Sequence, residues 1–244
     1  MQSATSTNIN SYSNSFIADD LTLKNISRWD YTKYLNIWVI RSIDNGSTQG
    51  YSFYPWDPLN ASGHDGVVLE YRSFGTIGNV SAPWNLGGVA AHEIGHWLGL
   101  YHTFEPDPFG DMSCNNNDCS QDGDKVCDTP PEFYAASGCP TNQNSCHTDV
   151  NNGSPFTSDV NDPTDNYMDY ADDACINTFT QGQKDRMYYN ILTYRLQNHL
   201  NCCNTFLAIS TLNNQVFNYG QNVNEGLGGV IDIINNGHLY VNAN

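Results

Sequence analysis

One eleven-residue segment of this 244-residue chain, from His92 to His102, constrains its fold more than any other. His92 and His96 are four residues apart, so both imidazoles point from one face if the segment is helical. We predict a helix over residues 86–98, ended by Gly99, because glycine tolerates the left-handed conformation that turns the chain back. His102 can then return to the other two histidines. The sequence therefore predicts a helix and turn that bring three imidazoles together.

Three neutral imidazoles around one point are zinc ligands, and they leave a fourth position open for water, as in catalytic rather than structural zinc sites. Glu93 lies about 100° further round the helix, where its carboxylate can reach that water. It can act as the general base and pass the proton to a leaving amine. The pattern predicts zinc-dependent hydrolysis of peptide bonds. Incidental histidines on a buried helix are the alternative, and for the remaining four we expect ordinary surface or core positions: His64, His147, His199 and His238.

The charge of the chain limits its partners. There are 26 acidic and nine basic residues, which give a net charge of −17. This balance disfavours nucleic acids and anionic membranes, since both bind positive surfaces. No apolar run approaches the roughly 20 residues that cross a bilayer. We expect a monomer that acts on proteins or peptides, with no nucleic-acid partner and no membrane insertion.

Eight cysteines indicate the compartment. Five of them lie between positions 114 and 146, in a segment rich in Asn, Asp, Gly and Pro. This pattern favours disulfides in an oxidising environment. The alternative, a structural zinc site, is disfavoured because the cysteines do not form two Cys-x-x-Cys units. The polar residues 1–6 lack the layout of a signal peptide. We therefore expect a secreted protein whose leader and pro-segment are absent from this chain.

The rest of the chain divides by pattern. Residues 35–40 and 67–71 are rich in β-branched and apolar residues and are predicted strands. Residues 102–165 lack periodicity, as expected of a long loop held by disulfides or metal. A capping box at 180–183 begins a helix whose apolar stripe we expect in the core. The members of this stripe are Tyr188, Ile191, Leu192, Leu196 and Leu200. We assign residues 1–203 to one catalytic domain, divided near residue 99. Residues 204–244, about a quarter Asn, are expected to be an extension or the start of a β-rich module.

The zinc motif, with Asn166-Tyr167-Met168-Asp169-Tyr170, resembles the metzincin metallopeptidases, in which a methionine lies beneath the metal. Met168 is that methionine, a position that an ordinary core residue would also fill. Over roughly residues 25–200 the chain resembles the pappalysin family more narrowly. The segments that carry this resemblance are Trp29-Asp30, 34–39, Gly87-Gly88, 100–104, 123–130, 166–170, 172–175, Phe179-Thr180, Gln183 and Arg186-Met187.

The resemblance implies an α/β metzincin fold. A twisted mixed, mostly parallel sheet and the active-site helix would lie above a loop-rich C-terminal subdomain. An extended substrate would pair with an edge strand, which we place near residues 65–71. The resemblance also implies the activity of a zinc endopeptidase. The rival functions are a non-catalytic module with the same fold, and binding of glycan or a secretion partner by residues 204–244.

The resemblance further implies roles for individual residues. Tyr170 would hydrogen-bond the oxyanion that develops on the substrate, with a core tyrosine as the alternative. Asp172 and Asp173 would select Arg or Lys after the scissile bond, or else face solvent. A structural calcium site, with a solvated loop as the alternative, would use hard oxygen ligands. Its ligands would come from Asp124, Cys127 and Thr129.

The resemblance also implies the pairing of the cysteines. Disulfides are expected between Cys119 and Cys146 and between Cys139 and Cys175. This leaves Cys114 to pair with Cys127. The partners of Cys202 and Cys203 stay open.

Overall fold

The computed structural model describes residues 8–106, 112–150 and 153–195, and the backbone of four strands between 208 and 243. The chain forms two compact units, Met1–Tyr194 and Arg195–Asn244, which divide earlier than the boundary expected at 203. Leu196, Leu200, Cys202 and Cys203 lie outside the described residues. In the parts of the chain that the structure describes, no helix has the length and apolar character needed to cross a membrane.

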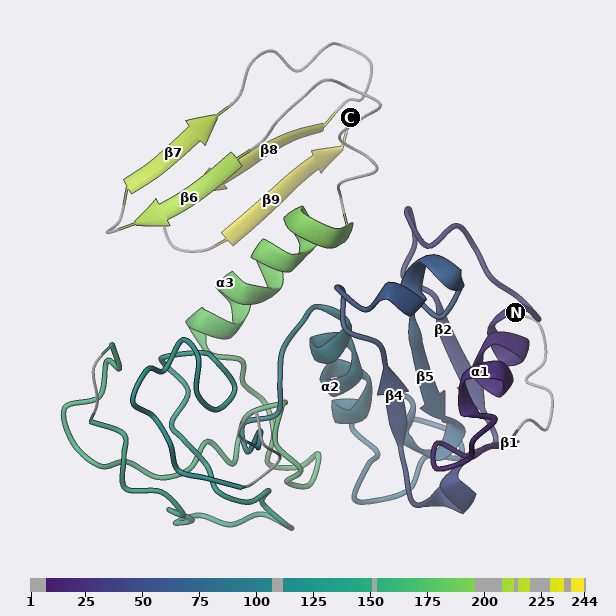
Figure 1. Ribbon diagram of the computed structural model, residues 1–244, viewed down its shortest axis with the longest axis horizontal. Coiled ribbons are helices and arrows are strands. Elements are labelled where there is room, and N and C mark those ends of the chain that lie inside the picture. Colours follow the sequence, from purple (N-terminus) through teal and green to yellow (C-terminus); the bar gives the residue numbers. More distant parts are fainter. Residues whose placement is uncertain are drawn as a thin grey trace. The chain divides into compact units, whose positions relative to one another are not determined.

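The second unit contains two antiparallel strand pairs (Figure 1). Strand β6 (Ala208–Leu212) pairs with β7 (Gln215–Tyr219), and β8 (Gly229–Ile234) pairs with β9 (His238–Ala243).

The sheet of the first unit is mixed. Its strand order is β2 (Ile37–Ile40), β5 (Val67–Glu70) and β4 (Gly50–Ser52), with β5 parallel to β2 and antiparallel to β4. A second parallel pair joins β1 (Asn8–Ile9) to β3 (Ser42–Ile43). The two strands predicted at 35–40 and 67–71 are therefore present as β2 and β5, and two of the three pairings are parallel.

The prediction of an edge strand near residues 65–71 is wrong, because β5 is the central strand. All four residues of β5, three apolar ones and Glu70, are buried, as expected of a strand covered on both faces. The chain between β2 and β5 turns back and places β4 on the other side of β5. The edge strand beside α2 (Gly88–Trp97) is thus β4.

Helices cover both faces of this sheet (Figure 1). Val68 packs with Trp38 and Leu23 on the side of α1 (Phe16–Lys24). Its neighbours Val67 and Leu69 point the opposite way and pack with Val89 of α2 (Gly88–Trp97). The helix predicted at 86–98 is therefore α2, held against the sheet by an apolar face.

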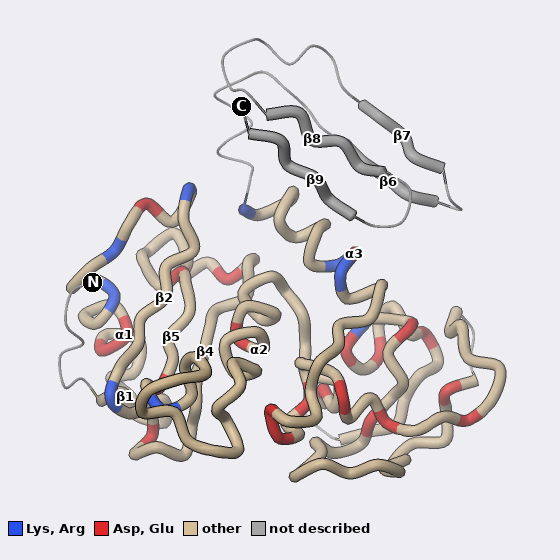
Figure 2. Tube along the Cα trace, turned by 180° about the vertical axis from the view of Figure 1, so that it is seen from behind, with Lys and Arg blue, Asp and Glu red and all other residues tan. Residues whose placement is uncertain are grey.

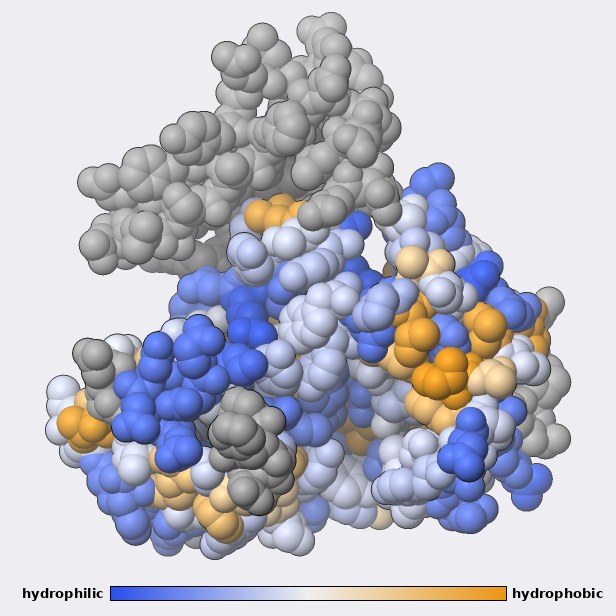
Figure 3. Space-filling model, viewed as in Figure 1, coloured by the Kyte–Doolittle hydropathy of each residue, from blue (hydrophilic) through white to orange (hydrophobic). Residues whose placement is uncertain are grey.

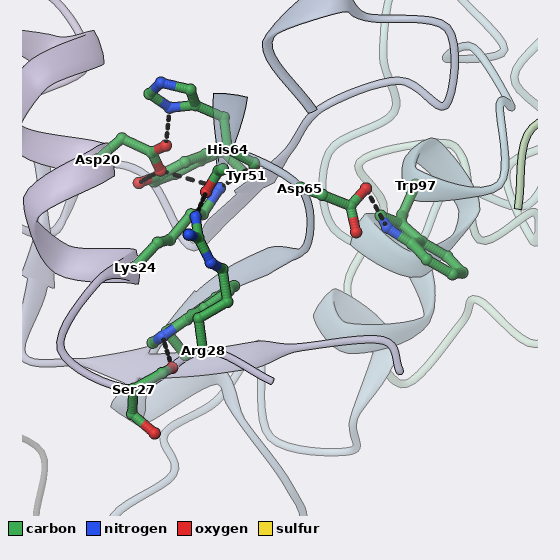
Figure 4. Close-up of polar contacts among 10 residues, drawn as sticks. Asp20, Lys24, Ser27, Arg28, Tyr51, His64, Asp65 and Trp97 are labelled. Carbon is green, nitrogen blue, oxygen red and sulfur yellow. Dashed lines mark hydrogen bonds and ion pairs between the residues drawn. The ribbon is translucent and has the colours of Figure 1, made fainter. Parts of the chain in front are cut away.

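A buried polar cluster also connects α1 to α2 (Figure 4). Asp20 accepts hydrogen bonds from the Tyr51 hydroxyl at 2.7 Å, and it pairs with Lys24 at 3.0 Å and with the ring of His64. The next residue, Asp65, accepts a hydrogen bond at 3.1 Å from the indole of Trp97, the last residue of α2. His64 is buried, so it occupies an ordinary core position, as expected.

Loops dominate residues 100–180, where the described residues contain no helix and no extended strand. More than half of the acidic residues lie in this segment, with Lys125 as its one basic residue. Figure 2 shows these acidic positions along the loops, and Figure 3 shows a largely hydrophilic surface over them. The acidic field of the protein is therefore concentrated in the C-terminal subdomain.

Three disulfides hold these loops, and one of them, Cys139–Cys175, joins the predicted partners. The other two predicted pairings are wrong, since Cys114 is bonded to Cys146 and Cys119 to Cys127. Turns after Asp118 fold this loop back and bring the Cα atoms of Cys119 and Cys127 to 4.8 Å. A disulfide forms only within about 4.4–6.8 Å between Cα atoms, so the loop path decides the partners.

The helix α3 (Gln181–Asn190) begins with the predicted capping box, in which Thr180 and Gln183 exchange hydrogen bonds, and it continues as one π-helical turn at Ile191–Arg195. Its apolar stripe is less buried than expected, because Tyr188, Ile191 and Leu192 are only half-buried. The buried side chains of α3 are instead the polar Gln183 and Asn190. Both have partners at the candidate site.

Candidate metal centre

The three histidines of the motif meet at one point. The Nε2 atom of His96 lies 3.1 Å from Nε2 of His92 and 3.0 Å from Nε2 of His102. In the portion of the chain that the structure describes, this is the only group of three or more His, Cys, Asp or Glu side chains with ligand atoms within 4.8 Å of one another. The spacing approaches the about 3.3 Å expected for two nitrogens at tetrahedral positions about 2.0–2.1 Å from zinc.

Backbone carbonyls fix the tautomers of two of these rings. Nδ1 of His92 lies 2.7 Å from the carbonyl of Tyr167, and Nδ1 of His96 lies 2.8 Å from that of Leu100. A carbonyl only accepts, so both Nδ1 atoms carry the proton and both Nε2 lone pairs face the centre. Burial is the main cause that lowers the pKa of His92 to about 3, and the neighbouring His102 ring is a smaller one. Burial also lowers the pKa of His96. Facing lone pairs repel one another unless a cation lies between them, so the residues fit a metal ion.

The turn at Gly99 brings His102 to the centre. Gly99 has a φ of +90°, and its N–H donates to the His96 carbonyl at 2.8 Å, while the N–H of Leu100 donates to Gly95 at 2.9 Å. This is a left-handed helix C-terminus of the kind that glycine favours. The turn places His102 as the sequence predicted.

Glu93 lies buried beside the edge strand. The Ser52 hydroxyl donates to the Glu93 carbonyl at 2.9 Å, and a Cβ atom at Gly50 would lie 2.7 Å from Cγ of Glu93. The absence of a side chain at Gly50 therefore lets β4 approach the active-site helix. Burial raises the pKa of Glu93 to about 8, and a cation nearby would lower it again. Sequence reasoning missed Gly50 and Ser52, whose role depends on the pairing of β4 with β5.

Tyr170 faces the three histidines, with its hydroxyl 3.1 Å from Nε2 of His102. The side chain is 48% exposed, so the alternative of a core tyrosine is wrong. Desolvation of the hydroxyl, with a smaller contribution from the charge of Glu93, raises the pKa of Tyr170 to about 12. The phenol therefore stays protonated and able to donate a hydrogen bond.

Met168 lies fully buried against α2. A Cβ atom at Gly95 would lie 2.4 Å from the Met168 sulfur, so the side chain fits only because position 95 is glycine. The Met168 N–H donates to Asn166 at 2.9 Å, and the amides of Asn166 and Gln183 exchange hydrogen bonds of 2.9 and 3.1 Å. This pairing explains why Gln183 of α3 is buried, and only the tertiary structure reveals it.

Two of the residues predicted for calcium lie buried side by side. Asp124 accepts from the N–H of Val126 at 3.0 Å through Oδ1, while its Oδ2 and the hydroxyl of Thr129 have no partner but each other among the described residues. They border a cavity of about 10 Å³ with Glu132. The third predicted residue, Cys127, is disulfide-bonded, so it could offer only its carbonyl. The alternative of a solvated loop does not fit, because these groups are buried.

Asp173 contacts the start of the active-site helix. Its Oδ2 accepts from the N–H of Leu86 at 2.7 Å and of Gly88 at 3.2 Å, and its Oδ1 is buried without a hydrogen-bond partner. A Cβ atom at Gly88 would lie 2.4 Å from that Oδ1. The solvent-facing alternative is therefore wrong for Asp173, which is 5% exposed, whereas Asp172 is half-buried.

Comparison with known proteins places this centre in a family. The family described as pregnancy-associated plasma protein-A matches residues 10–192, about three quarters of the chain. The chain belongs to the pappalysin family of metallopeptidases. The chain is similar in structure to mature mirolysin of Tannerella forsythia, solved in complex with a cleaved peptide. The TM-score is 0.59 and the identity 31%, and the match covers 81% of this chain and 67% of that one. The predicted metzincin-type α/β fold is thereby confirmed.

Two proteins named as extracellular metalloproteases are similar in sequence. An extracellular metalloprotease of Sordaria macrospora is 36% identical over 176 residues, and one of Neurospora crassa is 37% identical over 178 residues. Each alignment covers 70% of this chain and 53% of the relative. The chain thus spans about half the length of these curated relatives. Family membership implies a catalytic metal, and the three histidines are the described residues that fit it.

Proposed function

We propose that this pappalysin is a secreted zinc endopeptidase, with zinc held by His92, His96 and His102. The convergence of three Nε2 lone pairs carries the proposal. When bound, zinc supplies a Lewis acid and an activated water for attack on a peptide carbonyl. Glu93 takes a proton as general base and delivers it to the leaving amine. The relatives' extracellular names and the three disulfides support secretion.

Two further features position the substrate. The outer edge of β4, which pairs with no further strand among the described residues, offers backbone N–H and carbonyl groups to an extended peptide, next to Glu93. Tyr170 can donate its hydroxyl hydrogen to the oxyanion as negative charge develops, which stabilises the transition state more than the ground state.

Digestion of casein and of a peptide library tests this function. The protein should cleave internal bonds, lose activity with a zinc chelator, and regain it with added zinc. Full cleavage by metal-free protein would contradict the proposal. Cleavage restricted to chain ends would contradict the assignment as an endopeptidase.

We also propose that Asp173 gives a preference for Arg or Lys after the scissile bond. Among the described residues its buried Oδ1, beside the start of α2, has no hydrogen-bond partner, so a cationic side chain could satisfy it. The acidic C-terminal subdomain would add an attractive field for such substrates.

Asp173→Asn should reduce the preference for Arg over Leu in the residue after the scissile bond by about 10- to 100-fold. The reason is that a charge-assisted hydrogen bond contributes roughly 1.5–3 kcal/mol to binding. The ratio of kcat/KM for matched peptides measures this preference. Asp172→Asn is the matched control and should leave the ratio unchanged. An unchanged ratio in Asp173→Asn would remove Asp173 from the specificity pocket.

A structural calcium ion is proposed at Asp124 and Thr129, whose buried Oδ2 and hydroxyl have no partner but each other among the described residues. Without a cation, burial raises the pKa of Asp124 to about 8, so protons compete with calcium below that pH. Calcium added to zinc-loaded, calcium-depleted protein should raise the melting temperature, more strongly near about pH 8 than near about pH 5. Asp124→Asn should abolish this increase, whereas Asp118→Asn, an exposed acid in the same loop, should not. Equal calcium responses in Asp124→Asn and wild type would exclude the site.

A further inference from the structure

The helix α3 contacts the two turns that surround the metal centre. Its Gln183 binds Asn166 in the turn that carries Met168, here called the methionine turn. One to two helical turns later, Arg186 and Asn190 bind the turn at Gly99. We propose that Arg186 and Asn190 are positioning residues for His102, which they hold in place through the backbone of that turn. The proposal rests on the proposed function only in taking His102 as a metal ligand.

The backbone contacts are direct. Nε of Arg186 donates to the carbonyl of Gly99 at 2.7 Å, and Nδ2 of Asn190 donates to the carbonyl of Leu98 at 2.8 Å. Carbonyls at a helix C-terminus lack intrahelical partners and carry partial negative charge, so a cation and an amide donor both stabilise them. Asn190 is 3% exposed and lies directly against Gly99, where an added Cβ atom would be 2.1 Å from its Nδ2.

Arg186 also contacts the residue that precedes the ligand. Its guanidinium carbon lies 4.9 Å from the ring centroid of Tyr101 and 5.9 Å from that of Trp56. The side chain therefore holds the turn on both sides, by a hydrogen bond at Gly99 and by a cation–π contact at Tyr101. Lysine has no equivalent of the planar guanidinium, so it could not make both contacts in this geometry.

His102 needs this support more than the other two ligands do. The rings of His92 and His96 are each fixed by a hydrogen bond to a backbone carbonyl. The Nδ1 atom of His102 is instead 3.7 Å from Glu105, beyond hydrogen-bond distance, and the side chain is 23% exposed. The ring of His102 stacks on Phe104 with centroids 4.8 Å apart and contacts the Tyr170 hydroxyl at 3.1 Å, but in the described residues it makes no hydrogen bond to a backbone carbonyl, so its position also depends on the backbone that carries it.

The helix that supplies these contacts is itself fixed. Its first turn has a capping box, and the N–H of Gly182 donates to Asp128 at 2.8 Å. The buried amide pair with Asn166 sets its distance from the methionine turn. The side chains of Arg186 and Asn190 therefore extend from a backbone that has little freedom to shift.

The test compares Arg186→Ala, Arg186→Lys and Asn190→Ala with Lys184→Ala, an exposed position on the same helix. Competition with a chromophoric chelator would give the affinity for Zn²⁺ alone, without substrate. Cobalt-substituted protein would report ligand geometry by its visible absorption. Arg186→Ala and Asn190→Ala should bind zinc about 10- to 100-fold more weakly, the usual effect of losing a residue that orients a ligand.

Further readouts separate positioning from general stability. The kcat of Arg186→Ala should fall while its KM stays near wild type. Added guanidinium ion should partly restore zinc binding to this variant. The zinc affinity of Arg186→Lys should lie between those of Arg186→Ala and wild type. Lys184→Ala should match wild type. Wild-type zinc affinity and cobalt spectra in Arg186→Ala and Asn190→Ala, even with lower melting temperatures, would overturn the proposal. If Arg186→Ala does not fold, the Asn190→Ala and Arg186→Lys results decide it. Because zinc binding is measured without substrate, a failure of the peptidase proposal would appear separately.

Discussion

Glu93→Gln is expected to reduce kcat for peptide hydrolysis by about 10²- to 10⁴-fold, the usual contribution of a general base. The amide cannot accept the proton, whereas the histidines and their carbonyl partners are untouched. Zinc content and KM should therefore stay near wild type. Steady-state kinetics and metal analysis of the same preparation measure both. Glu105→Gln, which changes an acid near His102 outside the proposed proton path, is the control. A Glu93→Gln variant with wild-type kcat would refute the assigned role.

Glu93→Gln should also change the stability of the metal-free protein. Burial raises the pKa of Glu93 from 4.5 to about 8, so the native state keeps a proton that the unfolded state releases between these values. The contribution of Glu93 to stability therefore falls as pH rises through this window. Glu93→Gln should be stabilised relative to wild type, by more near about pH 8 than near about pH 5. Thermal unfolding at both pH values measures this, and bound zinc should diminish the difference. An equal difference at both pH values would contradict the burial argument.

Gly99→Ala is expected to have the largest effect on folding of any single methyl addition at the site. The φ of +90° is unfavourable for alanine, and the new Cβ atom would lie 2.1 Å from Asn190 and 2.9 Å from Trp56. Together the two effects should lower the free energy of unfolding by about 2–5 kcal/mol. Zinc affinity should fall as well, because the turn carries His102. Urea unfolding and zinc competition measure the two losses.

A matched control exists at Gly87, which has the same φ of +90° but no atom within 4 Å of an added Cβ. Gly87→Ala should cost only the conformational part, about 1–2 kcal/mol, and leave zinc affinity unchanged. Combining Gly99→Ala with Asn190→Ala removes one of the two overlaps, so the double variant should lose less stability than the sum of the single ones. Equal losses in Gly87→Ala and Gly99→Ala would show that packing against α3 does not matter.

Local patterns predicted local structure well. The spacing of His92, His96 and His102 with Gly99 predicted a helix and a turn, because helical periodicity and a left-handed glycine are properties of neighbouring residues. The capping box at 180–183 was predicted for the same reason. The strand at 67–71 was also predicted, but not its central place, which depends on how β4 folds back.

Predictions that depended on the path of a loop were less successful. Two of three disulfide pairings were wrong, since any cysteines whose Cα atoms come close enough can bond. The apolar stripe on α3 was expected to be its buried side, yet Gln183 and Asn190 are the buried residues. Buried polar groups need partners, and their partners lie 17 and 92 residues away in sequence.

The chemistry of the centre can be predicted from the motif: which side chains can bind a metal, which can act as a base, and where the helix that holds them must end. Those features follow from spacing within eleven residues and from the intrinsic properties of histidine, glutamate and glycine. The surroundings of that centre depend on the folded chain. It placed Ser52 and Gly50 against Glu93, Asp173 at the start of α2, and Arg186 and Asn190 on the turn before His102. Such contacts join segments far apart in the chain, and their partners are set by the packing of the whole unit rather than by any local pattern.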